Sequence, residues 1–200
     1  MNHTYHTIEN PSIAEFRDRG SRFIAFAFPI DTVPEFKTNL AELKKEHPKA
    51  VHHCFAYRIG SGNDVFRSSD DGEPSGTAGR PILGQIDSHN LTNVLVIVVR
   101  YFGGTLLGVP GLINAYKTVT ADALNKCRII ERTVLINYRL EFDYTITNEV
   151  MRRIKQFDCK IKKQDMQLFC VMELGVPADK KEEFLGSVKN LVQLKIEEIF

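Results

Sequence analysis

A short acidic segment holds the densest group of side chains in this sequence that could do chemistry. Asp70, Asp71 and Glu73 place three carboxylates within four residues, followed by the Thr77 hydroxyl and the Arg80 guanidinium. Carboxylates this close together can hold a divalent cation or serve as general acid and base. They can also accept hydrogen bonds from backbone N–H groups, as aspartates in turns commonly do, or pair with Arg80 or Arg100. The spacing is not that of an EF-hand, so the sequence favours a loop-shaping role, and we predict no bound metal.

A second candidate is a glycine-rich segment that follows an apolar run ending in Arg100. Glycines stand at Gly103, Gly104, Gly108 and Gly111. Glycine permits positive φ and lets a ligand approach the main chain closely. A helix predicted from Gly111 would add the partial positive charge of its N-terminus, so that a phosphate or carboxylate could bind there beside Arg100. The alternative is that the glycines only make a tight turn between strand and helix, because the spacing matches neither a Walker loop nor a dinucleotide-binding motif.

Cys54 is a third candidate, because it follows His52 and His53 on a predicted strand. A cysteine with a histidine base can act as a nucleophile. Neighbouring residues on a strand point to opposite faces, however, so His53 and Cys54 are badly placed to act on one another. The sequence therefore favours a core cysteine and a hydrogen-bonded histidine.

The composition bounds the class of protein. Lys and Arg number 26 against 25 Asp and Glu in 200 residues, so no strong field attracts nucleic acid or an anionic membrane, and an RNA partner would need a local patch. The four cysteines form no Cys-x-x-Cys pair, which favours reduced thiols over a disulfide frame or a zinc site. The first residues are polar and no apolar run approaches eighteen residues, so we place the protein in the cytoplasm and predict no membrane partner.

Hydrophobic spacing predicts the elements that position these residues in the first part of the chain. Thr32 and Glu35 form a capping box, and a helix is expected to follow it up to His47. The other expected elements are strands at 21–28, 51–59 and 94–99, a long loop at 60–81, and a helix from Gly111 to near Cys127. The loop and the end of the 94–99 strand carry the candidate residues, so function is expected there.

From about residue 128 the pattern changes to shorter alternating segments. Residues 134–142 and 166–174 alternate as strands with one buried face, and apolar residues at 150–157 and 184–191 recur at helical spacing. A further strand is expected at 192–200 and a weaker one at 159–163. The resulting order is β-α-β-β-α-β, which is typical of a ferredoxin-like domain.

Taken together, several segments resemble the YigZ/Impact family. The likeness is carried by residues 21–25, 52–58, 70–83 and 98–104, with Leu107–Gly108 and Gly111–Leu112. The resemblance implies an α+β protein of two domains. These are an N-terminal Impact domain over 1–129, an α/β sandwich like the second domain of ribosomal protein S5, and a C-terminal ferredoxin-like βαββαβ domain over 130–200.

The resemblance also implies a function. Members of the family are linked to translational control, the eukaryotic ones by binding a co-activator of a stress kinase, and bacterial ones are proposed to bind nucleic acid. Our leading hypothesis is a cytosolic, non-enzymatic binding protein in the regulation of translation or stress, docking on RNA or a ribosome-associated protein. The alternative is a phosphoester hydrolase that uses the Asp-Asp-Gly-Glu loop with a divalent cation.

The predicted site joins the two candidate segments into one surface. We expect the partner to contact Arg80, Arg100 and the backbone of Gly103, Gly104, Gly108 and Gly111, while Asp70, Asp71, Glu73 and Thr77 shape the loop. No cofactor is predicted. The chain departs from the family pattern at Leu106, Pro110 and Asn114, where lysine, glycine and arginine are usual. Two of these departures remove positive charge, so phosphate should bind the glycine segment more weakly here than in relatives.

Overall fold

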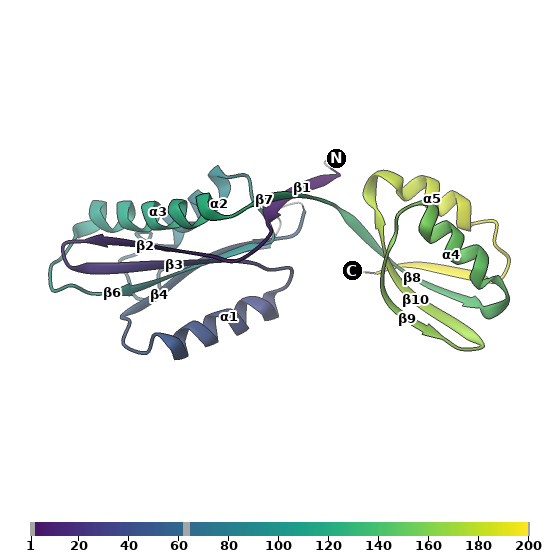
Figure 1. Ribbon diagram of the computed structural model, residues 1–200, viewed down its shortest axis with the longest axis horizontal. Coiled ribbons are helices and arrows are strands. Elements are labelled where there is room, and N and C mark those ends of the chain that lie inside the picture. Colours follow the sequence, from purple (N-terminus) through teal and green to yellow (C-terminus); the bar gives the residue numbers. More distant parts are fainter. Residues whose placement is uncertain (1–2, 62–64, 200) are drawn as a thin grey trace. The chain divides into compact units, whose positions relative to one another are not determined.

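The computed structural model describes residues 3–61 and 65–199 (Figure 1). The chain divides into two compact units, one formed by Tyr5–Arg132 and one that combines residues 3–4 with residues 133–199. Both units mix helices with strands, so the predicted α+β class is confirmed. Residues 62–64, which belong to the predicted loop 60–81, lie outside the described residues.

The first unit is built on a five-stranded sheet in which all neighbouring strands run antiparallel. In spatial order its strands are β2 (Ser12–Asp18), β3 (Ser21–Pro29), β6 (Val94–Tyr101), β4 (His52–Ile59) and β5 (Val65–Ser69). The central strand β6 is buried on both faces, which explains its unbroken apolar run. Another strand pair, β1 (Thr4–Ile8) with β7 (Ile129–Thr133), forms a separate two-stranded sheet.

Helices cover both faces of the five-stranded sheet. Figure 1 shows α1 (Val33–Glu46) on one side and α2 (Gly79–Ser88) with α3 (Gly108–Lys126) on the other. Successive side chains of β3 point to opposite faces of the sheet. Phe23 packs in the apolar cluster with α2 and α3, and Ile24 packs in the cluster with α1. The result is a three-layer unit with an apolar core on each side of the sheet.

The predicted start of α1 is confirmed. Thr32 is its N-cap, and the Thr32 side chain accepts a hydrogen bond from the Glu35 N–H at 3.5 Å. The Glu35 carboxylate in turn accepts from the Asp31 N–H at 2.7 Å, one residue before the cap. The two residues therefore act as the capping box that their spacing predicted. The Glu35 carboxylate differs only in binding the N–H of Asp31, where a standard capping box uses the N–H of the N-cap residue itself.

Two sequence predictions in the first unit are wrong. The segment 60–81 is not all loop, because it contains β5 and the first residues of α2. Since β5 is an edge strand with exposed side chains at its start, it lacks the alternation that marks a half-buried strand. The second error is the start of α3, which begins at Gly108 and not at Gly111. Pro110 does not prevent the earlier start, because proline is tolerated in the first turn of a helix.

The second unit has the βαββαβ order that its hydrophobic spacing predicted. Its elements are β8 (Leu135–Asp143), α4 (Thr147–Gln156), β9 (Lys160–Met166), β10 (Phe169–Pro177), α5 (Lys181–Val188) and β11 (Leu194–Ile199), with short 3₁₀ turns at Tyr144–Ile146 and Ala178–Lys180. The sheet order is β11-β8-β10-β9, and neighbouring strands are antiparallel. One face of the sheet packs on α4 and α5 around Leu140, Met172 and Phe184.

Gly84 offers a test of the helical conformation of α2, which begins inside the segment 70–83 that resembles the family. A Cβ at this exposed position would meet no atom within 4 Å. Gly84→Ala should therefore raise the free energy of unfolding by about 0.5–1 kcal/mol, because alanine loses less backbone entropy in a helix. Urea unfolding measures the change. Gly79→Ala is the matched control and should destabilise, since its Cβ would lie 2.8 Å from the Ser69 backbone nitrogen.

Candidate functional site

The Asp70 side chain caps the start of helix α2, although Asp70 is distant from that helix in sequence. Its Oδ1 accepts hydrogen bonds from the N–H groups of Ala78 at 3.0 Å and Gly79 at 2.8 Å, and its Oδ2 accepts from Gly76 at 2.9 Å. The N-cap residue of α2, Ala78, has no side chain to do this. The carboxylate thus satisfies free donors at the start of α2 from eight residues upstream, where the helix dipole also favours a negative charge.

These contacts control the protonation of Asp70. Burial by itself raises the pKa of the carboxyl, but hydrogen bonds from Gly76, Gly79 and Ala78 and the charge of Arg80 outweigh burial and lower the pKa below its usual value. A group with a lowered folded pKa stabilises the protein above the unfolded pKa, about 3.9 for aspartate, and loses that contribution as the pH falls through the folded pKa.

Asp70→Asn should therefore cost about 1–2 kcal/mol in the free energy of unfolding at pH 7. Once the pH falls below the unfolded pKa of about 3.9, the unfolded wild-type chain takes up a proton at this carboxyl, so the difference between the two proteins should shrink. Thermal unfolding of both proteins at pH 7 and at pH 3 measures this. A difference that stays the same at both values would show that the charge of Asp70 does not stabilise the loop.

Asp71 holds the same loop against strand β4. Its Oδ2 accepts from the His53 N–H at 2.7 Å, and its backbone carbonyl lies 2.8 Å from Nδ1 of His52. Asp71 has a φ of 42°, in the left-handed region. Further along the loop, the Thr77 hydroxyl donates to the Pro74 carbonyl at 2.7 Å. The side chains of Asp71 and Thr77 are thus both engaged within the protein.

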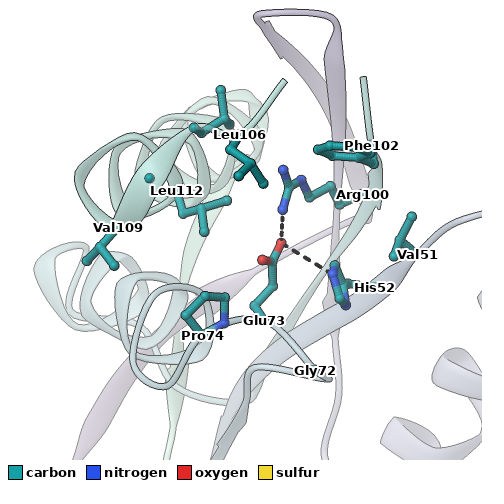
Figure 2. A pocket seen from close by; sticks show the side chains of 12 residues that line it. Val51, His52, Gly72, Glu73, Pro74, Arg100, Phe102, Leu106, Val109 and Leu112 are labelled. Atoms are coloured by element: carbon teal, nitrogen blue, oxygen red, sulfur yellow. Dashed lines mark hydrogen bonds and ion pairs between the residues drawn. The ribbon is translucent and has the colours of Figure 1, made fainter. Parts of the chain in front are cut away.

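Glu73 joins the acidic loop to the end of the buried strand. Its Oε1 lies 2.5 Å from Nη1 of Arg100, accepts from the Tyr116 hydroxyl at 2.8 Å, and lies 3.9 Å from Nε2 of His52. Figure 2 shows the contacts with Arg100 and His52. The carboxylate and the guanidinium are both buried. The acidic loop and the end of β6 therefore meet, as the sequence predicted, through an ion pair inside the protein.

A cavity of about 440 Å³ opens above this ion pair. Figure 2 shows its lining, which consists of Val51, His52, Gly72, Glu73, Pro74, Arg100, Phe102, Leu106, Leu107, Gly108, Val109 and Leu112. Four apolar side chains of the lining are exposed: Val51 at 55%, Phe102 at 48%, Leu106 at 81% and Val109 at 52%. We call these four residues the apolar rim. The site is therefore a pocket with a charged but internally paired floor and an apolar rim.

The predicted contact residues are not all placed alike. Arg100 lines the pocket but is only 5% exposed. Arg80 is exposed on α2 and is not among the lining residues. Gly108 lines the pocket with a φ of 69°, and Gly104, with a φ of 85°, lies outside the lining. The structure therefore brings Glu73, Arg100 and Gly108 together in the pocket lining, to which Arg80 does not belong.

The remaining two glycines make close packing contacts. Gly103 lies against Gly20, since a Cβ on Gly103 would fall 1.9 Å from the Gly20 carbonyl carbon. Gly111 lies in the first turn of α3, where a Cβ would come within 3.0 Å of Leu107 Cβ. Neither glycine lines the pocket.

Cys54 is a buried core residue, as the sequence favoured. Its thiol lies 3.3 Å from the Tyr116 hydroxyl and 3.0 Å from the Asp70 carbonyl. Burial raises the pKa of the Cys54 thiol and, on the opposite face of β4, lowers the pKa of His53. The histidine that shares a face with Cys54 is His52, two residues away, which the alternation of side chains along a strand could have identified.

The sequence analysis did not single out Tyr116, Val51, Phe102 or Val109 as site residues, and it named Leu106 only as a departure from the family pattern. Tyr116 falls on the apolar stripe of α3, so its spacing alone reads as core, and burial raises the pKa of its hydroxyl. Phe102 and Leu106 are loop residues without periodicity, and no pattern marks them as pocket lining. Within residues 3–61 and 65–199 no group of three or more His, Cys, Asp or Glu side chains is placed to hold a metal ion. No helix among these residues is both long and apolar enough to cross a membrane.

The fold and the pocket define a two-unit α+β protein with an apolar-rimmed pocket on its first unit. The sequence profile of the Impact N-terminal domain matches residues 19–124, which include all of the pocket lining. The chain belongs to the Impact family.

Relatives extend the match beyond this domain. The chain is 37% identical over 172 residues to IMPACT family member YigZ of Escherichia coli K12, covering 85% of this chain and 84% of that protein. It is 34% identical over 162 residues to IMPACT family member YvyE of Bacillus subtilis 168, covering 81% and 75%. A solved structure, described as that of a hypothetical protein, superimposes with a TM-score of 0.79 at 31% identity and covers 100% of this chain and 99% of its own.

Proposed function

We propose that this protein is a non-enzymatic binding protein of the cytoplasm that acts in the regulation of translation or stress by docking on a ribosome-associated protein. The family membership supports a regulatory role linked to translation. The observation that carries the docking role is the apolar rim, four exposed apolar side chains around a buried Glu73–Arg100 pair. Exposed apolar side chains gathered around a pocket are typical of surfaces that bind other molecules.

Charge favours a protein over RNA as the partner. Phosphate binding needs cationic side chains that are free to replace counterions. The charge of Arg100 is already balanced by Glu73, and the rim position 106 holds a leucine. Arg80 is exposed on α2 and is not among the residues that line the pocket. The contact surface around the pocket therefore offers apolar area more than positive charge.

The proposal extends to the two domains. We assign residues 1–129 to an Impact domain with the fold of the second domain of ribosomal protein S5, and residues 130–200 to a ferredoxin-like domain. The three-layer arrangement of the first unit supports the former assignment. The βαββαβ order and the strand order β11-β8-β10-β9 support the latter.

Photo-crosslinking from the rim tests the proposed partner class. Leu106 is replaced by benzoylphenylalanine, and the protein is irradiated in an extract of its own cells that contains ribosomes. We expect a discrete adduct that nuclease leaves intact, that protease removes, and that sediments with ribosomal particles. The control places the same probe at Leu168, which is 72% exposed on the second unit and should give no such adduct. An adduct shortened by nuclease would identify RNA as the partner, and absence of any adduct specific to position 106 would contradict the docking role.

A further inference from the structure

The pocket is large enough for a side chain and has the walls for an apolar one. Its volume of about 440 Å³ lies in the usual range for ligand pockets. Below the rim, Leu107 and Leu112 are buried and line the cavity from the start of α3. Figure 2 shows Leu112 and Val109 facing Arg100 and Phe102 across the hollow. An occupant would thus bury its apolar surface between α3 and the end of β6.

The floor of the pocket has hydrogen-bond donors that the protein does not use. Arg100 places Nη1 on Glu73, while its Nη2 reaches only the Ser21 hydroxyl at 3.5 Å. Among the described residues the Arg100 Nε–H has no hydrogen-bond partner, but it is fully buried, so the donors of Arg100 that an occupant could reach lie on Nη1 and Nη2. A guanidinium carries five N–H donors and no acceptor, and a buried donor left unpaired is costly. An occupant that pairs with the Arg100 guanidinium must therefore bring an acceptor oxygen.

A second, independent feature favours an acceptor at the same place. Helix α3 begins at the pocket, and its N-cap residue, Leu107, provides no side-chain hydrogen bond to the first free N–H groups. The start of a helix prefers an acceptor or a negative charge. Gly108 and Val109, the first two residues of the helix, both line the cavity.

The charge of the floor decides which kind of acceptor fits. Glu73 cancels the charge of Arg100, so the pair is neutral as a whole. A phosphate would bring negative charge next to the buried Glu73 carboxylate, which like-charge repulsion disfavours. A carbonyl oxygen accepts the same hydrogen bonds without that repulsion.

We propose that the pocket binds a leucine- or phenylalanine-type side chain of a protein partner, whose neighbouring main-chain carbonyl accepts a hydrogen bond from Arg100. This inference rests on the proposed function for the partner being a protein. The apolar side chain fills the hollow between Leu112 and Phe102, and the rim closes around it. The Phe102 ring, 5.7 Å from the Arg100 guanidinium, is placed to cover both groups.

An NMR titration with single capped residues tests this directly. N-acetyl-leucinamide and N-acetyl-phenylalaninamide are added to the full chain, with N-acetyl-alaninamide and inorganic phosphate as comparisons. We expect saturable shifts of the Leu107, Val109 and Leu112 methyl signals, with the leucine compound binding about tenfold or more tightly than the alanine compound. Equal binding of the leucine and alanine compounds, shifts outside the pocket, or saturable binding of phosphate alone would each overturn the inference.

A variant of an exposed rim residue tests the same binding without disturbing the core of the protein. Leu106→Ser changes an 81% exposed side chain and should weaken binding of N-acetyl-leucinamide about fivefold. Leu168→Ser, on the second unit, is the matched control and should leave binding unchanged. If the capped residues fail to bind while Leu106 still crosslinks to a protein, only this inference is wrong. If they bind and no crosslink forms, the proposed function is wrong instead.

Discussion

Replacing Glu73 by alanine should lower the free energy of unfolding of the Tyr5–Arg132 unit by about 3–5 kcal/mol. Arg100 is only 5% exposed, and Glu73 is its partner at 2.5 Å. Without the carboxylate, a positive charge remains in the interior with no counter-charge, and the Tyr116 hydroxyl loses its acceptor. Because β6 is the central strand of the sheet, the penalty applies to the whole unit. Urea unfolding followed by the NMR signals of β6 amides measures the loss without interference from the second unit.

Two further variants separate the buried charge from other effects of the substitution. Glu73→Ala combined with Arg100→Met removes both charges, so the double variant should lose less stability than the two single losses added together. Glu15→Ala removes a carboxylate from an exposed pair with Arg22 on the same unit and should cost far less than Glu73→Ala. Equal losses of unfolding free energy for Glu73→Ala and Glu15→Ala would mean that water enters and solvates the charge of Arg100 when Glu73 is removed.

The elements of this protein were predictable where burial imposes a simple period. β6 is buried on both faces, so its sequence is an unbroken apolar run. The Thr32–Glu35 capping box marks the start of α1. The alternating strands of the second unit gave its βαββαβ order for the same reason. β5 escaped prediction because an edge strand pairs on one side only and its exposed side chains need no apolar pattern.

The site was predictable in its location but not in its character. Clustered carboxylates and glycines pointed to the two segments that meet at the pocket, and pairing of the acidic loop with Arg100 was one of the open alternatives. Whether Arg100 is exposed or buried depends on how α3 and the loop pack over it, and no local pattern encodes that. The apolar rim could not be predicted either, because a sequence does not distinguish an exposed leucine or phenylalanine in a loop from a buried one.

Among the glycines of its segment, Gly103 has the closest backbone contact, which leaves no room for a Cβ. Arg19 and Gly20, both with positive φ, form the two-residue turn between β2 and β3. Gly103 packs directly on this turn: a Cβ would lie 1.9 Å from the Gly20 carbonyl carbon and 2.2 Å from the Ser21 nitrogen. The Gly103 N–H also donates to the Ser21 hydroxyl at 3.2 Å. The residue thereby fixes the chain that follows Phe102 at the edge of the pocket.

Gly103→Ala should therefore cost about 3 kcal/mol or more in the free energy of unfolding, because the clash is with the backbone of the Gly20–Ser21 peptide and no side chain can move to relieve it. Gly104→Ala is the matched control: its φ is 85°, but a Cβ there meets nothing within 4 Å. That variant should lose only about 1 kcal/mol from left-handed strain. Urea unfolding of the two variants compares them, and NMR shifts of Ser21 and Phe102 should move in Gly103→Ala alone. Similar losses in both variants would mean that backbone conformation, and not the contact with the β2–β3 turn, selects glycine at position 103.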